Sequence, residues 1–160
     1  MILVTVGMQL GFDRLIKAMD GLAPMLGMEV VAQTGKGTYQ PVNMTAHDRI
    51  APAEFEALVK DCSLIVSHAG IGTILTAQRL GKPIVIVPRR LEYGEHRNDH
   101  QIATARNLEG RNGLLIALDE SELSDRIAQG LEITDTRAER SPTARTLHDA
   151  VTQFIETGHL

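Results

Sequence analysis

Residues 63–90 read SLIVSHAGIGTILTAQRLGKPIVIVPRR, and this stretch decides the fold. It begins with an apolar run over residues 64–67 that predicts a buried strand, and the apolar spacing over residues 73–80 predicts a helix. The Gly-Lys-Pro sequence at 81–83 ends that helix, and residues 84–87 predict a second buried strand. Two buried strands joined by a helix form a βαβ unit, which places the strands parallel in one sheet.

The same alternation of strand and helix patterns continues along the chain. It predicts an α/β fold, a Rossmann-like parallel sheet with helices on both faces, and we expect residues 1–160 to form a single domain. A C-terminal amphipathic helix is expected over 144–156, either packed in the core or docked on a second subunit. The other predicted strands are residues 2–6, 29–33, part of 42–50 and 114–118, and the other predicted helices are 12–22, 52–61, 98–108 and 121–131.

Composition excludes several classes of function. The net charge is −4 and only 3% of the 160 residues are aromatic, which argues against a nucleic-acid partner. Cys62 is the single cysteine, so the chain has no internal disulfide or thiolate metal site. Residues 1–13 lack the basic start of a signal peptide, and no apolar run approaches the ~20 residues of a spanning helix. We therefore expect a cytoplasmic protein.

The loop between the predicted strand at 64–67 and the following helix has the chemistry of an anion site. Gly70 and Gly72 allow a ligand to approach the backbone, and the helix N-terminus presents unsatisfied N–H groups and its positive dipole end. His68 and Thr73 add side-chain donors, so a diphosphate is a suitable ligand. The alternative is a tight turn with His68 hydrogen-bonded inside. A dinucleotide fingerprint fits poorly, because Leu75 holds the third glycine position.

Residues 88–101, PRRLEYGEHRNDHQ, form the second loop of interest. Its charges balance, and its mixture of hydrogen-bond donors and acceptors suits sugar hydroxyls, although a solvated surface loop has the same composition. Both loops follow predicted strands, as does Gly7, so all three regions should meet at the carboxyl edge of the sheet, where such folds bind ligands. We expect no metal site, although Glu95, His96, Asp99 and His100 have a conceivable spacing.

These motifs together resemble the C-terminal domain of family 28 glycosyltransferases. The resemblance rests on residues 67–73, SHAGIGT, residues 80–88, LGKPIVIVP, and residues 98–101, NDHQ. It extends to residues 2–7 and to GEH at 94–96, and covers about residues 1–118. Within this family, the sequence resembles more narrowly the small stand-alone versions of the domain. They include the catalytic subunit of the two-part UDP-GlcNAc transferase of N-glycan assembly and bacterial exopolysaccharide glucuronosyltransferase subunits.

The resemblance implies the nucleotide-sugar half of a GT-B enzyme that is divided between two chains. Such an enzyme is inverting and moves a sugar from a UDP-sugar to a lipid-linked acceptor, with no cofactor or metal. The acceptor half would be a membrane-anchored partner subunit, which would hold this chain at the inner face of the membrane. The donor-binding residues expected from the motifs and from the resemblance are Gly7, His68, Ala69, Gly70, Ile71, Gly72, Thr73, Thr76, Arg89, His96, Asp99 and Gln101.

Two features leave alternatives open. Related enzymes carry an acidic ribose ligand at the position of Thr76, so the chain could instead be a non-catalytic subunit that binds a nucleotide sugar or acts as a scaffold. No residue is a clear catalytic base. His96 and Glu95 are possible, and the base could also come from the partner.

Overall fold

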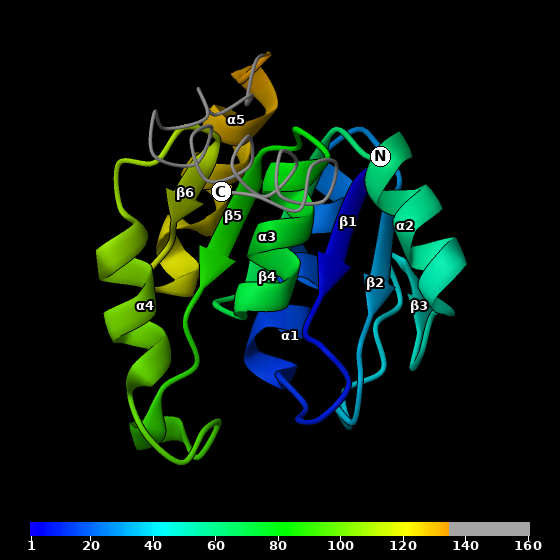
Figure 1. Cartoon of the computed structure of the whole chain (residues 1–160). Coiled ribbons are helices and arrows are strands. Elements are labelled where there is room, and N and C mark those ends of the chain that lie inside the picture. The colour runs from blue at the N-terminus through cyan, green and yellow to red at the C-terminus, as the bar shows by residue number, and fades with distance from the viewer. Residues whose placement is uncertain (135–160) are drawn as a thin grey trace, which may run out of the picture.

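A computed structural model describes residues 1–134, which form one parallel sheet with the strand order β3-β2-β1-β4-β5-β6 (Figure 1). Every pair of neighbouring strands is parallel. The predicted Rossmann-like fold is confirmed. The strands are β1 (Ile2–Thr5), β2 (Val30–Gln33), β3 (Thr45–His47), β4 (Leu64–His68), β5 (Ile84–Val87) and β6 (Leu114–Ile116).

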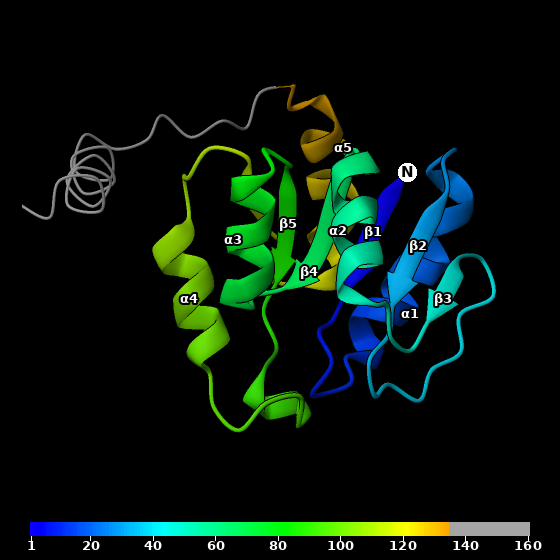
Figure 2. The same ribbon diagram turned by 45° about the vertical axis from the view of Figure 1, so that its right-hand side comes forward.

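Helices cover both faces of this sheet (Figure 2). Alternate strand residues point to opposite faces, so Ile2 and Val4 join a core with α1 and α5, while Leu3 and Ile65 join a core with α2, α3 and α4. The helices are α1 (Asp13–Leu22), α2 (Pro52–Asp61), α3 (Ile71–Arg79), α4 (His100–Leu108) and α5 (Leu123–Glu132), with 3₁₀ turns η1 (Ala23–Met25), η2 (Leu91–Tyr93) and η3 (Glu120–Glu122).

Several predicted boundaries are wrong. Helix α3 begins at Ile71 rather than residue 73, because Gly70 takes an extended N-cap conformation and its carbonyl accepts the Ile74 N–H. Of the strand pattern expected in part of 42–50, only the three exposed residues of β3 form a strand. The strand expected to reach residue 118 ends at 116, and the Leu118 carbonyl accepts a bond from Arg90. The predicted helix at 144–156 lies outside the described residues.

The sheet topology has a switch point at the first strand. Strand β1 pairs with β2 on one side and with β4 on the other, so the chain leaves β1 in one direction and later returns in the opposite one. At such a switch point the loops after the two central strands diverge, and ligands bind between them. Gly7 follows β1, and His68 ends β4. Among residues 1–134 no helix is long and apolar enough to cross a membrane.

Candidate active site

The His68 ring is enclosed by two glycines. A Cβ atom at Gly7 would lie 3.2 Å from His68 Cε1, and one at Gly70 would lie 2.7 Å from the same atom and closer still to Nε2. Gly7 also has a φ of +75°, a conformation that costs other residues free energy. Both glycines are therefore required by the position of the ring. The structure brings the loops after β1 and β4 together, as predicted from the sequence.

Burial keeps the His68 imidazole neutral. Burial and, next, the positive charge of Arg89 lower the pKa of His68 to about 4, against the opposing effect of a hydrogen bond to the Thr5 backbone. Ser67 Oγ lies 3.3 Å from His68 Nδ1. At neutral pH the ring therefore carries a single N–H donor and no charge. A ligand oxygen would compete with the Thr5 backbone for this N–H, and the neutral ring does not attract an anion as a cation.

The start of α3 offers free backbone donors beside this ring. Gly70 is its N-cap, and no side chain caps the helix. A Cβ atom at Gly72 would meet nothing within 4 Å, so the first turn is open to an approaching ligand. Thr73 is partly buried in the same turn. Unsatisfied N–H groups at a helix N-terminus bind phosphate well, so the geometry suits the predicted diphosphate.

Thr76 lies one turn further along α3. Its hydroxyl donates to the Gly72 carbonyl at 2.9 Å, a bond within its own helix. The oxygen can still accept a hydrogen bond, but the donor is already used. Ala69 is buried, whereas Ile71 is 53% exposed on the first turn.

Arg89 is a predicted donor-binding residue, but its side chain is buried and bonded to backbone carbonyls, so it is not free to contact a phosphate directly. It is 3% exposed, and its Nη2 donates to the carbonyls of Val6 at 2.7 Å and Leu10 at 2.9 Å. Burial lowers its pKa to about 10, with Glu95 opposing the shift. The guanidinium also lies 5.1 Å from the centre of the Phe12 ring. Arg89 thus ties the loop after β1 to the end of β5 and adds positive charge near the His68 ring.

The loop after β5 holds the other predicted residues. Gln101 is 8% exposed, and its Oε1 accepts the Arg89 N–H at 3.0 Å, which leaves its amide NH₂ group available. Asp99 is exposed, and its Oδ1 accepts the Leu91 N–H at 3.1 Å. His96 Nδ1 lies 3.0 Å from Asn98 Oδ1. Within residues 1–134 no three His, Cys, Asp or Glu side chains are grouped to hold a metal ion.

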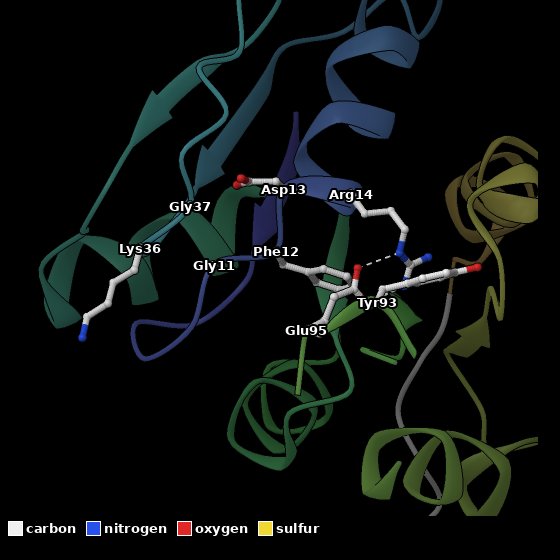
Figure 3. Close-up of a pocket in the computed structure, with 9 residues that line it drawn as sticks. Gly11, Phe12, Asp13, Arg14, Lys36, Gly37, Tyr93 and Glu95 are labelled. Carbon is white, nitrogen blue, oxygen red and sulfur yellow. Dashed lines mark hydrogen bonds and ion pairs between the residues drawn. The ribbon is translucent and has the colours of Figure 1, made fainter. Parts of the chain in front are cut away.

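Sequence reasoning missed the contact that anchors this loop. Arg14, at the start of α1, forms a two-pronged ion pair with Glu95, 81 residues away (Figure 3). The pair borders a cavity of about 440 Å³ between the start of α1, the turn at Lys36–Gly37 and the loop residues Tyr93–Glu95. No local sequence pattern indicates the role of Arg14, because a single arginine in the first turn of a helix is ordinary.

Glycines beside an uncapped helix N-terminus, at the switch point of a parallel sheet, are typical of α/β domains that bind nucleotides. The family of this chain is shown by sequence. Residues 1–154 match the glycosyltransferase family 28 C-terminal domain, and the chain belongs to that family. The resemblance recognised in the motifs is confirmed.

The UDP-N-acetylglucosamine transferase subunit ALG13 of Cryptococcus neoformans var. neoformans serotype D is 32% identical over 94 residues. This match covers 58% of the chain and 44% of that relative, so the chain spans less than half of the relative's length.

Solved structures share the fold. The solution structure of ALG13 has a TM-score of 0.59 at 15% identity, covering 98% of this chain and 96% of the other. The spinosyn rhamnosyltransferase SpnG, complexed with spinosyn aglycone, has a TM-score of 0.60 at 23% identity and covers 98% of this chain but only 44% of the enzyme. The chain therefore has the size of the first and the fold of less than half of the second.

Proposed function

We propose that this chain is the donor-binding catalytic subunit of a two-subunit, inverting glycosyltransferase that moves a sugar from a UDP-sugar to a lipid-linked acceptor. The observation that carries the proposal is the neutral His68 ring beside the uncapped start of α3. Family membership supplies the reaction class. We further propose exopolysaccharide or glycan assembly as the setting.

In this proposal the start of α3 stabilises the departing diphosphate. The reaction breaks the bond between the sugar and the diphosphate, so negative charge grows on the leaving oxygen. Backbone N–H groups of residues 71–73 are donors fixed before the reaction, which is the efficient way to stabilise such charge, and the neutral His68 ring lies beside them. Arg89 acts from behind them, because its guanidinium is bound to Val6 and Leu10. Asp99 and the Gln101 amide face the donor sugar or ribose.

The acceptor and its activation are assigned to a second, membrane-anchored subunit. The relative ALG13 is described as a transferase subunit, and single-chain neighbours such as SpnG are more than twice as long as this chain. Glu95 is held by Arg14, which disfavours it as the base that removes the acceptor proton. We assign that base to the partner, and through the partner a place at the cytoplasmic face of the membrane.

A second candidate function is a non-catalytic subunit that binds a nucleotide sugar. The observation that favours it is Thr76, whose hydroxyl is bonded to Gly72 instead of being free for a ribose. A threonine with its donor used is a weaker ribose ligand than a carboxylate, which accepts from two hydroxyls.

The test is a calorimetric titration of the chain with UDP, UDP-GlcNAc and UDP-glucuronic acid. We expect UDP to bind, and expect Gly72→Val to abolish binding because the added side chain lies where the phosphate approaches. The matched control is Gly21→Val, since Gly21 is also a helical glycine at which an added Cβ would meet nothing within 4 Å.

The result separates the candidates. Equal loss in both valine variants, or UDP binding that survives in Gly72→Val, contradicts the proposed diphosphate site. Transfer by the chain together with its partner, lost in Gly72→Val, supports the catalytic subunit. Binding of UDP without transfer in that complex supports the non-catalytic one.

A further inference from the structure

Arg14 binds the loop after β5 at two separate points, the Glu95 carboxylate and the Pro88 carbonyl. Its Nε and Nη2 donate to the two carboxylate oxygens of Glu95 at 2.8 and 3.0 Å, and Nη2 also donates to the Pro88 carbonyl at 3.1 Å (Figure 3). Its Nη1 donates to Glu120 at 2.7 Å. One side chain thus fixes the start of the loop and its middle to α1, and also connects both to η3.

Aromatic rings hold the guanidinium in this orientation. The Arg14 guanidinium carbon lies 5.2 Å from the ring centres of both Phe12 and Tyr93, and that of Arg90 lies 5.7 Å from Tyr93. The Arg14 and Glu95 side chains are only 15% and 11% exposed. Burial alone would lower the pKa of Arg14, but its bonds to Glu95 and Glu120 raise it, so the ion pair stays charged. The planar fork and the stacking are properties of arginine that lysine lacks.

Glu95 connects Arg14 to the backbone of the loop at residues 88–101. Its Oε2 also accepts the Arg90 N–H at 3.0 Å, and its own N–H donates to the Arg90 carbonyl at 3.2 Å. The 3₁₀ turn η2 that follows Arg90 is held at its first residue by Asp99, which accepts the Leu91 N–H. The proposed sugar-facing Asp99 is therefore connected to Arg14 through Glu95 and η2.

We propose that Arg14 is a positioning residue for the donor sugar: acting through Glu95, it sets the loop at residues 88–101 in the shape that recognises the sugar of a UDP-sugar. This inference rests on the proposed function. Neither residue has a hydrogen bond or ion pair to residues 68–73, where the diphosphate would lie. The pair should thus govern how much the sugar adds to binding, and leave the affinity for UDP itself unchanged.

The experiment compares UDP with the tightest-binding UDP-sugar in Arg14→Gln and wild type by calorimetry. We expect the affinity for the UDP-sugar to fall by roughly tenfold, the effect of about one well-placed hydrogen bond, with little change for UDP. Arg14→Lys should restore the charge but not the affinity, because it cannot make the two-pronged contact. Arg126→Gln is the matched control, since Arg126 lies on α5 and pairs at 3.8 Å with Glu122 of η3, outside the loop at residues 88–101.

Glu95→Gln and the double variant complete the test. If Arg14 acts through Glu95, the double variant should lose no more affinity for the UDP-sugar than Arg14→Gln alone, because the two act as one unit. Additive losses, or equal losses for UDP and the UDP-sugar in a folded Arg14→Gln, overturn the inference. A wild type that binds UDP and UDP-sugars equally also overturns the inference, but it does not contradict the proposed UDP site. A wild type that binds neither overturns the proposed function, and this inference with it.

Discussion

Protonation of His68 should destabilise the fold below neutral pH. The partly buried imidazole has a pKa of about 4, whereas its ordinary value is 6.5. In the unfolded chain the ring takes up a proton as the pH falls below about 6.5, whereas in the folded chain it does so only near 4. The unfolded state therefore binds more protons between these values, and the free energy of unfolding falls as the pH is lowered through that window.

The size of the effect follows from the separation of the two pKa values. At about 1.36 kcal/mol per unit, His68 should lower the free energy of unfolding by about 2 kcal/mol between pH 7 and pH 5, and by about 3 kcal/mol once the pH reaches 4. Urea unfolding of wild type and His68→Gln at several pH values isolates this contribution, because all other titrating groups contribute nearly equally to both proteins.

The expected result is a difference between the two unfolding free energies that shrinks from pH 7 to pH 4. His100→Gln is the matched control for loss of a histidine side chain, since His100 is exposed at the start of α4. A His68→Gln profile that parallels wild type would show that the ring is solvated, and would remove the argument for a neutral ring beside the start of α3.

Three further predictions follow from contacts around the candidate site and the core. Gly70→Ala should lower the free energy of unfolding by more than ~1 kcal/mol because its methyl group meets the His68 ring, whereas Gly21→Ala in open space should gain up to ~1 kcal/mol; urea unfolding compares them. Arg89→Met should cost about 2–4 kcal/mol by removing the bonds to Val6 and Leu10, and should raise the pKa of His68 in an NMR titration; an unchanged pKa would show that Arg89 does not act on the ring. Burial raises the pKa of Cys62 to about 11, so a thiol reagent should label it only after unfolding, and rapid labelling of the native chain would contradict its burial.

The sheet could be predicted because its strands are buried on both faces. Strands of this kind need continuous apolar runs, and residues 84–87 between Pro83 and Pro88 are too short for a helix. The sequence predicts the helix Pro52–Asp61 with the observed bounds, since proline favours the first helical position. Short exposed elements such as β3 are poorly predicted, because their positions depend on neighbouring strands rather than on their own sequence.

The contacts around the predicted site residues could not be inferred from the sequence. Arg89 and Arg90 are adjacent arginines, yet the first is buried against carbonyls of the loop after β1 and the second reaches the Leu118 carbonyl. Both lie in the loop after β5, and only the packed loops determine which partners they meet. Likewise, Glu95 is one of several acidic residues in a balanced loop, and only the fold places Arg14 beside it.

The two glycines of the motif at 67–73 have separate physical roles. Gly70 makes room for the His68 ring, and its extended conformation starts α3, so it would be required even without a ligand. Gly72 has neither role, because a Cβ at this position would contact nothing. A glycine within a helix also costs up to ~1 kcal/mol relative to alanine. Gly21 in α1 is equally open, so the open space at Gly72 does not by itself indicate a ligand. What distinguishes Gly72 is its place in the uncapped first turn of α3, where the proposed diphosphate would bind.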